Sequence, residues 1–390
     1  MDIDQLFSRG VAEVIVEAEL RERLKSGRPL RLKMGFDPSS PNLHIGHAVG
    51  LRKLRQFQEL GHTVVLIVGD WTAQVGDPSG RDQSRTMLSA EQVRANADTY
   101  MQQFFHIVDR DRTEVRWQSE WFGTFTLANV FDLTARFTMQ QMLAHETFRK
   151  RFEGESPLTM MELMYPLLQA YDSVAINADV EFGGTDQKFN ILAGRELMKS
   201  KGLEPQQVFL TSLLVGVDGR KMSKSFNNTV DFTMPPHEMY GRIMAMSDDI
   251  IMPYFINATD VPQSELDELQ RALQGGENPR NLKMRLAREI VTQFHGPQEA
   301  REGEEYFVRT IQKREVPEDM PVHRLTAPTS IVDLLAEARL VGSKSEARRL
   351  IEGGGVKING AKVDSQEARI EPGNEYVLQV GKRKFVRVVG

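Results

Sequence analysis

The stretch that most restricts the fold is the unbroken apolar run TVVLIV (63–68), which is typical of a β-strand buried on both faces of a sheet. A further strand is predicted upstream in PLRLKMGFD (29–37). Between the two, apolar residues recur at helical spacing in IGHAVGLRKLRQFQEL (45–60), and Gly61 ends the pattern. Strand, helix and strand in this order predict a right-handed βαβ unit of a parallel sheet.

A second α/β passage is predicted further along the chain. The run DVEFGG (179–184) has the character of a strand end, and QVFLTSLLVG (207–216) is another strand. Between them, Thr185 is expected to cap the helix DQKFNILAGRELM (186–198). The segment that separates the two passages, about 89–178, is mostly helical in pattern and is interpreted as an insertion.

The C-terminal part differs in character. Helices are predicted over 235–312, and three prolines make 313–330 a linker. Two helices follow, SIVDLLAEARL (330–340) and SKSEARRLIEGG (343–354), and the Asn-Gly pair in GVKINGAKV (355–363) predicts a tight hairpin. The predicted domains are therefore 1–232, 233–312, a linker at 313–328, and 329–390.

Composition restricts the function classes. The chain has 390 residues and no cysteine, which excludes disulfides and thiolate metal sites and fits a reducing compartment. The N-terminus, MDIDQLFSRG, is acidic where a signal peptide is basic. No apolar run approaches the roughly 18 residues that a membrane span requires. We therefore expect a cytoplasmic protein with no membrane partner.

Charge is distributed unevenly along the chain. The net charge is −5, but residues 329–390 carry 11 Lys and Arg against 8 Asp and Glu, which gives +3. Residues 1–328 carry the other 38 Lys and Arg against 46 Asp and Glu, which gives −8. A basic tail on an acidic body indicates that the tail alone contacts a polyanion. A solvated, lysine-rich surface would have the same charge.

The stretch NLHIGHAVGLRK (42–53) places His44 and His47 around Gly46 at the start of a predicted helix. Glycine lets a ligand approach the backbone, and the unpaired N–H groups of a helix start attract an anion such as phosphate. Two other interpretations compete: histidines bonded to the backbone, and a metal-binding pair, for which no third ligand is near. Neither GxGxxG nor GxxxxGKS/T occurs in this unit, so the dinucleotide fingerprint and the P-loop are both absent.

A second polar stretch, GVDGRKMSKSF (216–226), carries Lys221 and Lys224 after a predicted strand. Flexible ammonium groups suit charge that develops during a reaction, although a lysine-rich loop alone is usually solvated surface. Together, HIGH at 44–47 and KMSKS at 221–225 match the two signatures of class I aminoacyl-tRNA synthetases letter for letter and in order. The chain therefore resembles that family.

The segment YPLLQAYDS (165–173) sets Tyr165, Gln169 and Asp172 on one helical face, so that a phenol, an amide and a carboxylate lie together. A surface helix also has a polar side, but the apolar neighbours leave little room for an exposed face. Pro166 is expected in the first turn of this helix or at a kink. The pattern resembles the tyrosyl-tRNA synthetases. Further matches are GFDP (35–38), GDPSGR (76–81), SEWF (119–122), GGTDQ (183–187) and a tail similar to an S4 RNA-binding domain.

This resemblance implies an α/β fold. Its parts are a Rossmann-like parallel-sheet catalytic domain with a helical insertion, an α-helical anticodon-side middle domain and a small α+β S4-like C-terminal domain. The resemblance also implies a tyrosine–tRNA ligase that uses ATP, with Mg²⁺ carried by the ATP, to make tyrosyl-adenylate and then charge the tRNA for tyrosine. Bacterial-type members are homodimers with the insertion at the interface. No metal site of the protein's own is expected.

The resemblance also assigns site residues by position. Catalysis is expected from His44, His47, Lys221 and Lys224. ATP binding is expected from Ser39, Gly46, Gly184, Asp186, Lys221 and Lys224. Tyrosine binding is expected from Lys33, Gly35, Asp37, Asp77, Tyr165, Gln169, Asp172 and Gln187. RNA binding is expected from Lys344, Arg348, Arg349, Lys382, Arg383 and Lys384.

Two residues depart from the pattern, and three other functions compete. Lys33 stands where many relatives have a tyrosine, although a subgroup carries lysine, and Gln118 stands where asparagine is common. An aminoacyl-tRNA synthetase for another aromatic amino acid, chiefly tryptophan, fits Asp172 and Gln169 poorly, because indole offers only one hydrogen-bond donor. A small nucleotidyltransferase with a HIGH signature would not need the KMSKS stretch, the helical region and the tail. A non-catalytic RNA-binding protein would show no ATP–pyrophosphate exchange.

Overall fold

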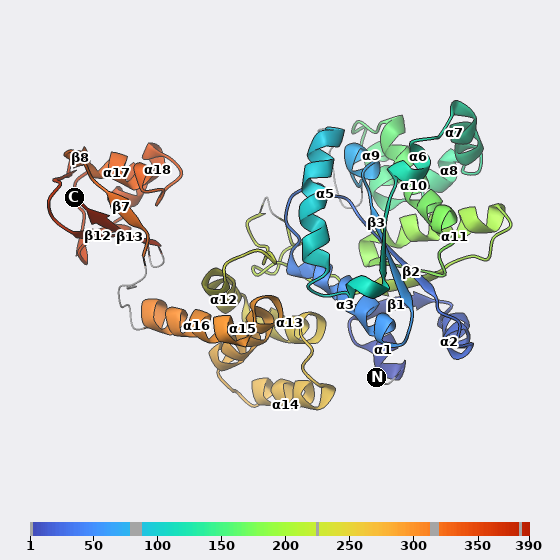
Figure 1. Ribbon diagram of the computed structural model, residues 1–390, viewed down its shortest axis with the longest axis horizontal. Coiled ribbons are helices and arrows are strands. Elements are labelled where there is room, and N and C mark those ends of the chain that lie inside the picture. Colours follow the sequence, from blue (N-terminus) through green and yellow to red (C-terminus); the bar gives the residue numbers. More distant parts are fainter. Residues whose placement is uncertain (1–2, 79–87, 224–225, 313–319, 382–383) are drawn as a thin grey trace. The chain divides into compact units, whose positions relative to one another are not determined.

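The computed structural model describes residues 3–78, 88–223, 226–312, 320–381 and 384–390 (Figure 1). Contacts divide the chain into two compact units, 1–235 with 242–294 and 236–241 with 295–390. The domain boundaries given above, which assign the whole of 233–312 to one domain, stay predictions. Among the described residues, no helix is long and apolar enough to cross a membrane.

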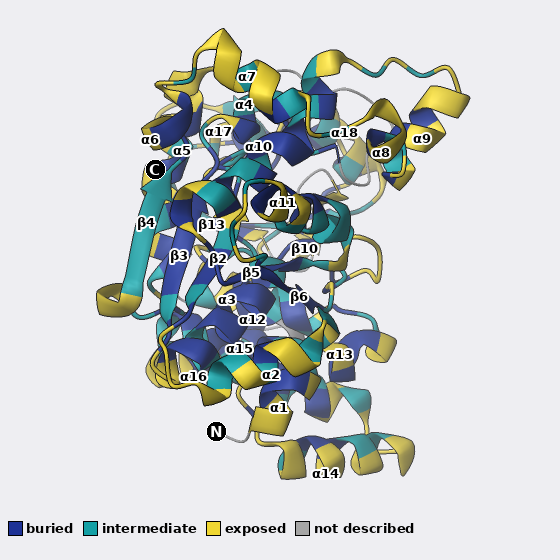
Figure 2. Ribbon diagram, turned by 90° about the vertical axis from the view of Figure 1, so that its right-hand side faces the viewer, coloured by how far each residue is buried: buried dark blue, intermediate teal, exposed yellow. Residues whose placement is uncertain are grey.

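The larger unit is built on a six-stranded sheet in the order β1-β6-β5-β2-β3-β4, and Figure 2 shows β6, β5, β2, β3 and β4 in this order. The first strand in this order runs antiparallel to its neighbour, and the other neighbours are parallel. Because the chain leaves β2 towards β3 and β4 and returns to the other side of β2 with β5, the carboxyl ends of β2 and β5 form a topological switch point. Open α/β sheets bind their ligands at such a point. The strands are β1 Val11–Ile15, β2 Arg31–Phe36, β3 Thr63–Val68, β4 Thr113–Trp117, β5 Val180–Gly184 and β6 Gln207–Thr211.

The predicted βαβ unit is confirmed. The apolar run forms β3, in which Val64 to Val68 are buried, and Figure 2 shows the inner strands in the buried colour. The predicted helix is α3 (Ile45–Glu59), whose pattern ends at Gly61 with a φ of 94°, a conformation that glycine adopts without strain. The predicted parallel sheet of an α/β fold is therefore present.

Helices make up most of the rest of the chain up to residue 307. The helices before and within the predicted insertion are α1 Ile3–Ser8, α2 Glu17–Lys25, α4 Thr72–Val75, α5 Ala90–Phe104, α6 Ser119–Phe122, α7 Leu127–Thr134, α8 Met139–Met142, α9 Glu146–Glu153 and α10 Met160–Ile176. The later helices are α11 Lys188–Ser200, α12 Pro236–Met244, α13 Ile251–Ala258, α14 Gln263–Gln274, α15 Pro279–His295 and α16 Pro297–Phe307. The outer side of α14 is largely exposed (Figure 2).

Two local predictions differ from the structure. The predicted insertion contains a strand, β4, which the sequence did not predict, because this half-buried edge strand has no apolar run long enough to identify it. Thr185 does not cap a helix: a 3₁₀ turn, Thr185–Gln187, precedes α11, and Gln187 takes the cap position. Of the two places open to Pro166, the structure has the one inside α10, because the helix is capped further upstream by Thr159, whose side chain accepts a hydrogen bond from the Glu162 N–H.

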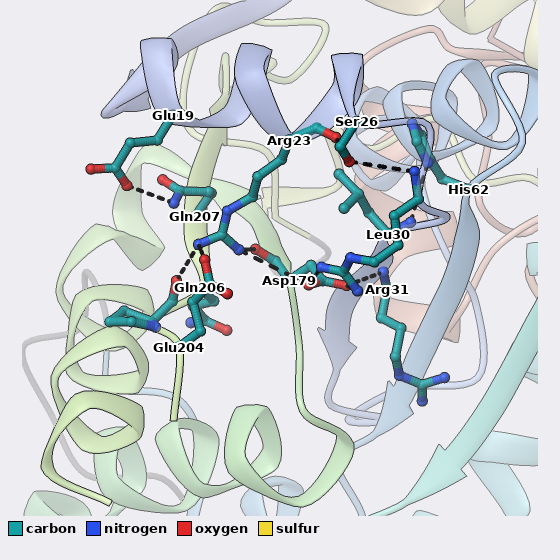
Figure 3. A network of polar contacts seen from close by, with 12 residues as sticks. Glu19, Arg23, Ser26, Leu30, Arg31, His62, Asp179, Glu204, Gln206 and Gln207 are labelled. Carbon is teal, nitrogen blue, oxygen red and sulfur yellow. Dashed lines mark hydrogen bonds and ion pairs between the residues drawn. The ribbon is translucent and has the colours of Figure 1, made fainter. Parts of the chain in front are cut away.

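A polar network fixes the amino ends of the strands, opposite the switch point (Figure 3). The Asp179 carboxylate, just before β5, accepts a hydrogen bond from the Arg31 N–H of β2 at 2.8 Å. Arg23 of α2 forms an ion pair with Glu204 at 2.6 Å, close to the start of β6. Arg23 thereby attaches α2 to the amino ends of the strands, away from the switch point.

The segment 251–261 is attached to the N-terminus of the chain. The Arg9 guanidinium donates hydrogen bonds to the carbonyl groups of four residues, Phe255, Ile256, Thr259 and Val261. Burial lowers the pKa of Arg9, because it removes the guanidinium group from water. The four carbonyl groups take the place of water around its charge. Helix α13 also contacts α3, so this part of the helical region belongs to the larger compact unit.

The tail has its own apolar core beneath two helices, α17 Ile331–Glu337 and α18 Lys344–Glu352. Ser330 and Ser343 cap these helices, because their side chains accept hydrogen bonds from the Asp333 and Glu346 N–H groups. The predicted hairpin is confirmed, because Asn359 and Gly360 both have positive φ, 49° and 82°, as a type I′ turn requires. The sheet is β10 Ala361–Lys362, β9 Val356–Ile358, β12 Tyr376–Val380, β13 Lys384–Val389 and β7 Val322–Arg324 in spatial order, and β8 Thr329–Ser330 pairs with β11 Arg369–Ile370.

Candidate functional site

A cleft of about 580 Å³ lies at the switch point of the larger unit. Its wall includes the segment after β2, the start of α3, one face of α10, the end of β5 and the segment after β6. Of the residues predicted to bind ATP or tyrosine or to act in catalysis, fourteen line it: Gly35, Asp37, Ser39, His44, Gly46, His47, Asp77, Tyr165, Gln169, Asp172, Gly184, Asp186, Gln187 and Lys221. Lys33 does not line the cleft, and Lys224 lies outside the described residues.

The HIGH signature forms the N-terminal turn of α3. The backbone N–H of His44 donates to Nδ1 of His47 at 3.1 Å, and the two rings lie 3.9 Å apart between centroids. Nδ1 of His47 also lies 3.2 Å from the His44 carbonyl oxygen, so this edge of the ring is turned towards the backbone. A Cβ on Gly46 would lie 3.0 Å from the His44 ring, so a larger residue here would displace that ring. The turn therefore presents hydrogen-bond donors to an anion.

Backbone pairing brings the second signature to the first. The Ile45 N–H donates to the Val230 carbonyl at 2.8 Å, and Phe232 N–H donates to the Leu43 carbonyl at 3.0 Å. Met222 of KMSKS lies near enough for its sulfur to be 3.3 Å from a Cβ placed on Gly46. The two signatures, far apart in sequence, thus meet on one cleft.

Lys221 lines the cleft on the side of Asp186. Its Nζ lies 3.9 Å from Oδ2 of Asp186 at the end of β5, and its side chain is 60% exposed. Burial raises the pKa of Asp186, and the Lys221 charge opposes this rise. An exposed ammonium group at the cleft mouth is free to move towards a phosphate chain without breaking a buried contact.

Asp172 forms the polar end of the α10 face. Its two carboxylate oxygens accept hydrogen bonds from Gln118 Nε2 at 2.9 Å and from the Trp121 indole N–H at 3.1 Å. Burial raises the pKa of Asp172 to about 7, while the Lys33 charge and these two hydrogen bonds lower it. An acceptor so oriented, at the base of a cleft, suits a ligand hydroxyl group that donates.

The opposite end of the cleft is acidic. The Tyr165 hydroxyl donates to Asp37 at 2.9 Å, and Thr72 donates to the other oxygen of Asp37 at 2.7 Å. Gln187 Nε2 donates to Asp77 at 2.7 Å. Burial raises the pKa of Tyr165 well above its ordinary value, and the neighbouring carboxylates add to the rise, so it stays a neutral hydroxyl. This end is suited to a cation.

Sequence reasoning missed several residues of the site. Trp121 and Thr72 were not identified as partners of the predicted aspartates, and Glu181 and Ser173 were not identified as neighbours of Lys33. Gln118 was noted only as a departure from the usual residue. The signal available for Trp121 was its place in the motif SEWF (119–122), which directly follows Gln118. Nothing in the local patterns indicates the other three.

The predicted RNA-binding residues lie in the tail. Arg348 and Arg349 are exposed on α18, and Lys344 at its start forms an ion pair with Asp333 at 2.6 Å. Lys384 begins β13, and its Nζ donates to the Leu340 carbonyl at 2.8 Å. Lys382 and Arg383 are outside the described residues.

Metal ligands do not gather in the structure as described: no group of three or more histidine, aspartate or glutamate side chains is placed to hold a metal ion. The cleft carboxylates Asp37 and Asp77 are each engaged by a hydroxyl or amide donor. Carboxylates that share hydrogen-bond donors in this way can also accept hydrogen bonds from an organic cation.

Comparisons with known proteins show the family to which the chain is similar. Residues 25–312 match the family described as tRNA synthetases class I (W and Y), and 312–388 match the tyrosine--tRNA ligase SYY-like C-terminal domain. The tyrosine--tRNA ligase of Dehalococcoides mccartyi is 53% identical over 99% of this chain and 98% of its own. That of Thermotoga maritima is 48% identical over 99% of this chain and 97% of its own.

Solved structures show the same fold. A C-terminally truncated mitochondrial tyrosyl-tRNA synthetase of Aspergillus nidulans has a TM-score of 0.65 and 23% identity, and the match covers 78% of this chain and 92% of that one. The tyrosyl-tRNA synthetase of Archaeoglobus fulgidus, solved with L-tyrosine, has a TM-score of 0.63 and 22% identity, over 78% and 100% of the two chains.

Proposed function

This chain belongs to the tyrosyl-tRNA synthetases of class I, so its activity is the ATP-dependent joining of tyrosine to tRNA, and we propose that the cleft at the ends of β2 and β5 performs both steps. The proposal depends on one observation: the start of α3, the segment at Lys221 and the Tyr165 face of α10 line the same cleft. Each of the three provides the chemistry that one part of the reaction needs.

The α10 face and the acidic end select the amino acid. The Asp172 carboxylate accepts the O–H of the substrate phenol, a hydrogen bond that phenylalanine cannot make. The ammonium group has three donors and no acceptor, so Asp77, the Gln169 amide oxygen and the Tyr165 hydroxyl oxygen suit it. With its phenol at Asp172 and its ammonium group at the acidic end, the substrate is oriented with its carboxylate towards α3.

The first step forms tyrosyl-adenylate. A carboxylate oxygen of tyrosine attacks the α-phosphorus of ATP, the bond from that phosphorus to the bridging oxygen breaks, and pyrophosphate leaves. The substrate provides the nucleophile, so the protein contributes position and charge stabilisation. His44, His47 and the α3 N-terminus act on one side of the phosphates, and Lys221 acts on the other. Mg²⁺ enters on the ATP phosphates and neutralises part of their charge.

The second step transfers tyrosine to RNA. A hydroxyl of the 3′-terminal ribose of the tRNA attacks the carbonyl carbon of the adenylate, and AMP leaves. Gly184 and Asp186 hold the ribose of the adenylate at the end of β5, where a Cβ on Gly184 would lie 2.6 Å from Leu213. The exposed cations of α18 contact the tRNA backbone. Because tRNA charging takes place where proteins are made, we also propose a cytoplasmic location.

ATP–pyrophosphate exchange measured with each of the twenty amino acids tests this function. Tyrosine alone is expected to support rapid exchange. If exchange is fastest with tryptophan, the amino-acid substrate is tryptophan and the assignment of tyrosine is wrong. No exchange with any amino acid, from a folded protein that binds RNA, would replace it by a non-catalytic function.

We propose in addition that the protein is a homodimer, because the insertion exposes large apolar side chains. Leu127 and Phe131 of α7, Phe152 of α9 and Met160 of α10 are all more than 60% exposed. Large apolar side chains exposed within one segment of a chain favour an interface there. Sedimentation equilibrium is expected to give twice the chain mass and Phe131→Asp to give monomers, whereas the control Val322→Asp in the tail stays dimeric. A monomeric unaltered protein would contradict this.

A further inference from the structure

Lys33 and Glu181 form an ion pair inside the sheet, behind the wall of the cleft. They are direct partners in the register of β2 and β5, the two strands of the switch point. The Lys33 Nζ lies 3.0 Å from Glu181 Oε1, and their side chains are 0% and 1% exposed. Removing two charges from water is costly, and a buried pair is stable only where further hydrogen bonds satisfy it.

Those hydrogen bonds converge on α10. Lys33 Nζ donates to the Gln169 carbonyl at 2.8 Å and to Ser173 Oγ at 2.8 Å. Glu181 accepts from Gln169 Nε2 at 3.0 Å, from Ser173 Oγ at 3.1 Å and from Gln206 Nε2 at 2.5 Å. The lysine therefore holds the main chain of Gln169, and the glutamate holds its side chain.

This arrangement decides which way the Gln169 amide faces. A carboxylate only accepts hydrogen bonds, so the NH₂ group of the amide must face Glu181 and its oxygen must face away. Gln169 also lines the cleft. The oxygen is thereby available to a ligand ammonium group, and the opposite orientation of the amide would present donors that repel it.

The same pair acts on Asp172, one turn further along α10. The charged or titratable groups that face Asp172 are Lys33 of β2, Glu181 of β5 and Tyr165 of α10 itself, while Gln118 and Trp121 are neutral donors. Burial raises the pKa of Asp172 to about 7; the Lys33 charge lowers it and the Glu181 charge raises it. Lys33 thus favours the ionised carboxylate, which can accept a hydrogen bond at both oxygens.

We propose that Lys33 and Glu181 are positioning residues for amino-acid recognition, which together fix the orientation of Gln169 and the charge of Asp172 without touching the substrate. Lys33, assigned above to the tyrosine site by resemblance, would then act through α10 instead of on the phenol. This inference rests on the proposed function of the cleft and names the residues that adjust its selectivity.

Lys33→Met and Glu181→Gln, each close in size to the original residue, test the proposal in the full-length protein. Tyrosine-dependent ATP–pyrophosphate exchange is measured from pH 5.5 to 9, with kcat and KM resolved at each pH. Both variants are expected to raise KM for tyrosine by about tenfold or more, with a smaller change in kcat. The pH at which KM falls is expected to move up in Lys33→Met and down in Glu181→Gln, because the two variants remove charges of opposite sign.

A matched control separates positioning from general damage to the core. Lys53 is a second buried lysine, on α3, where its Nζ donates to the Leu6 carbonyl at 2.9 Å. Lys53→Met is expected to leave the pH profile of KM unchanged. The double variant Lys33→Met with Glu181→Gln has no unpaired buried charge and provides a folded protein if a single variant unfolds. In the double variant, the pH at which KM falls is expected to lie between the values of the two single variants, and KM is expected to stay raised.

The proposal would be overturned by equal pH profiles in all variants, or by a shift in the same direction for both single variants. A double variant with the KM and pH profile of the unaltered protein would also overturn it. These results are distinct from failure of the proposed function, in which the unaltered protein itself shows no tyrosine-dependent exchange.

Discussion

At the residue scale, the proposed function assigns selection of the amino acid to Asp172, whose carboxylate accepts hydrogen bonds from Gln118 and Trp121. Asp172→Ala removes the acceptor for the substrate phenol but leaves space for the ring. Discrimination between tyrosine and phenylalanine is therefore expected to fall by about tenfold or more. The ratio of kcat/KM for exchange with the two amino acids measures this, and an unchanged ratio would refute the assignment.

The ionisation of Asp172 gives a pH dependence. Burial raises the pKa of Asp172 to about 7, so its carboxylate is largely protonated at pH 6 and largely ionised at pH 8. We expect kcat/KM for tyrosine to rise across this interval as the acceptor forms. Asp172→Asn, which cannot ionise, is expected to lose that step, and a variant that keeps it would show that another group titrates.

Lys221 is the residue that tests the charge-stabilising role of the second signature. Lys221→Ala is expected to slow single-turnover formation of tyrosyl-adenylate by about 10²-fold, while tyrosine binds with unchanged affinity. Lys25→Ala removes a lysine of α2 that is paired with Glu22, and serves as the control. Lys224→Ala is expected to behave like Lys221→Ala. Normal single-turnover rates in both signature variants would be incompatible with the mechanism.

At the element scale, α10 depends on a buried ion pair near its start. Arg151 of α9 and Glu162 of α10 lie 2.7 Å apart, and both are buried. Although burial opposes ionisation, hydrogen bonds from Arg151 and Thr159 lower the pKa of Glu162 to about 2. Because an unfolded glutamate has a pKa of about 4.3, this pair contributes stability above about pH 4 that is lost as the pH falls towards 2.

Glu162→Gln leaves Arg151 buried without its counter-ion. We expect the free energy of unfolding to fall by about 3 kcal/mol at pH 7, and the difference to shrink in acid. Urea denaturation at pH 7 and pH 3 measures both effects. Glu146→Gln breaks an exposed pair with Lys150 and is expected to change stability little, so equal losses in the two variants would contradict the argument.

The elements show which parts of the fold are predictable from sequence. β3 and α3 follow from local patterns, because an unbroken apolar run and a helical stripe are each set by neighbouring residues. β4 does not, because an edge strand of five half-buried residues has neither pattern. The segment around Pro166 leaves both the first turn and the interior of α10 open to this proline, because the cap that starts the helix, Thr159, lies in a separate polar stretch.

The site divides in the same way. The two signatures and the Tyr165 face identify most cleft residues, because each is a short motif. The Lys33–Glu181 pair escaped prediction, because it depends on the register of two strands that are distant in sequence. Trp121 escaped because its hydrogen bond to Asp172 joins α6 to α10 across the core.

At the scale of the whole molecule, the catalytic cleft and the basic tail belong to different compact units, so their contributions should separate. Reversing Arg348 and Arg349 to glutamate is expected to weaken tRNA charging and to reduce its dependence on salt, while tyrosine-dependent exchange stays normal. A chain that ends at Ala327 is expected to behave similarly. Charging by the reversed variant at the full rate would show that the tail does not hold the tRNA.

The central claim is that both signatures and the α10 face act on one adenylate. A crystal structure of the protein with a non-hydrolysable analogue of tyrosyl-adenylate tests it directly. The account predicts the phenol at Asp172 and the phosphate within hydrogen-bond distance of His44 or His47, with Lys221 on the opposite side. An analogue bound with its phenol away from α10, or with its phosphate distant from both signatures, would contradict the account.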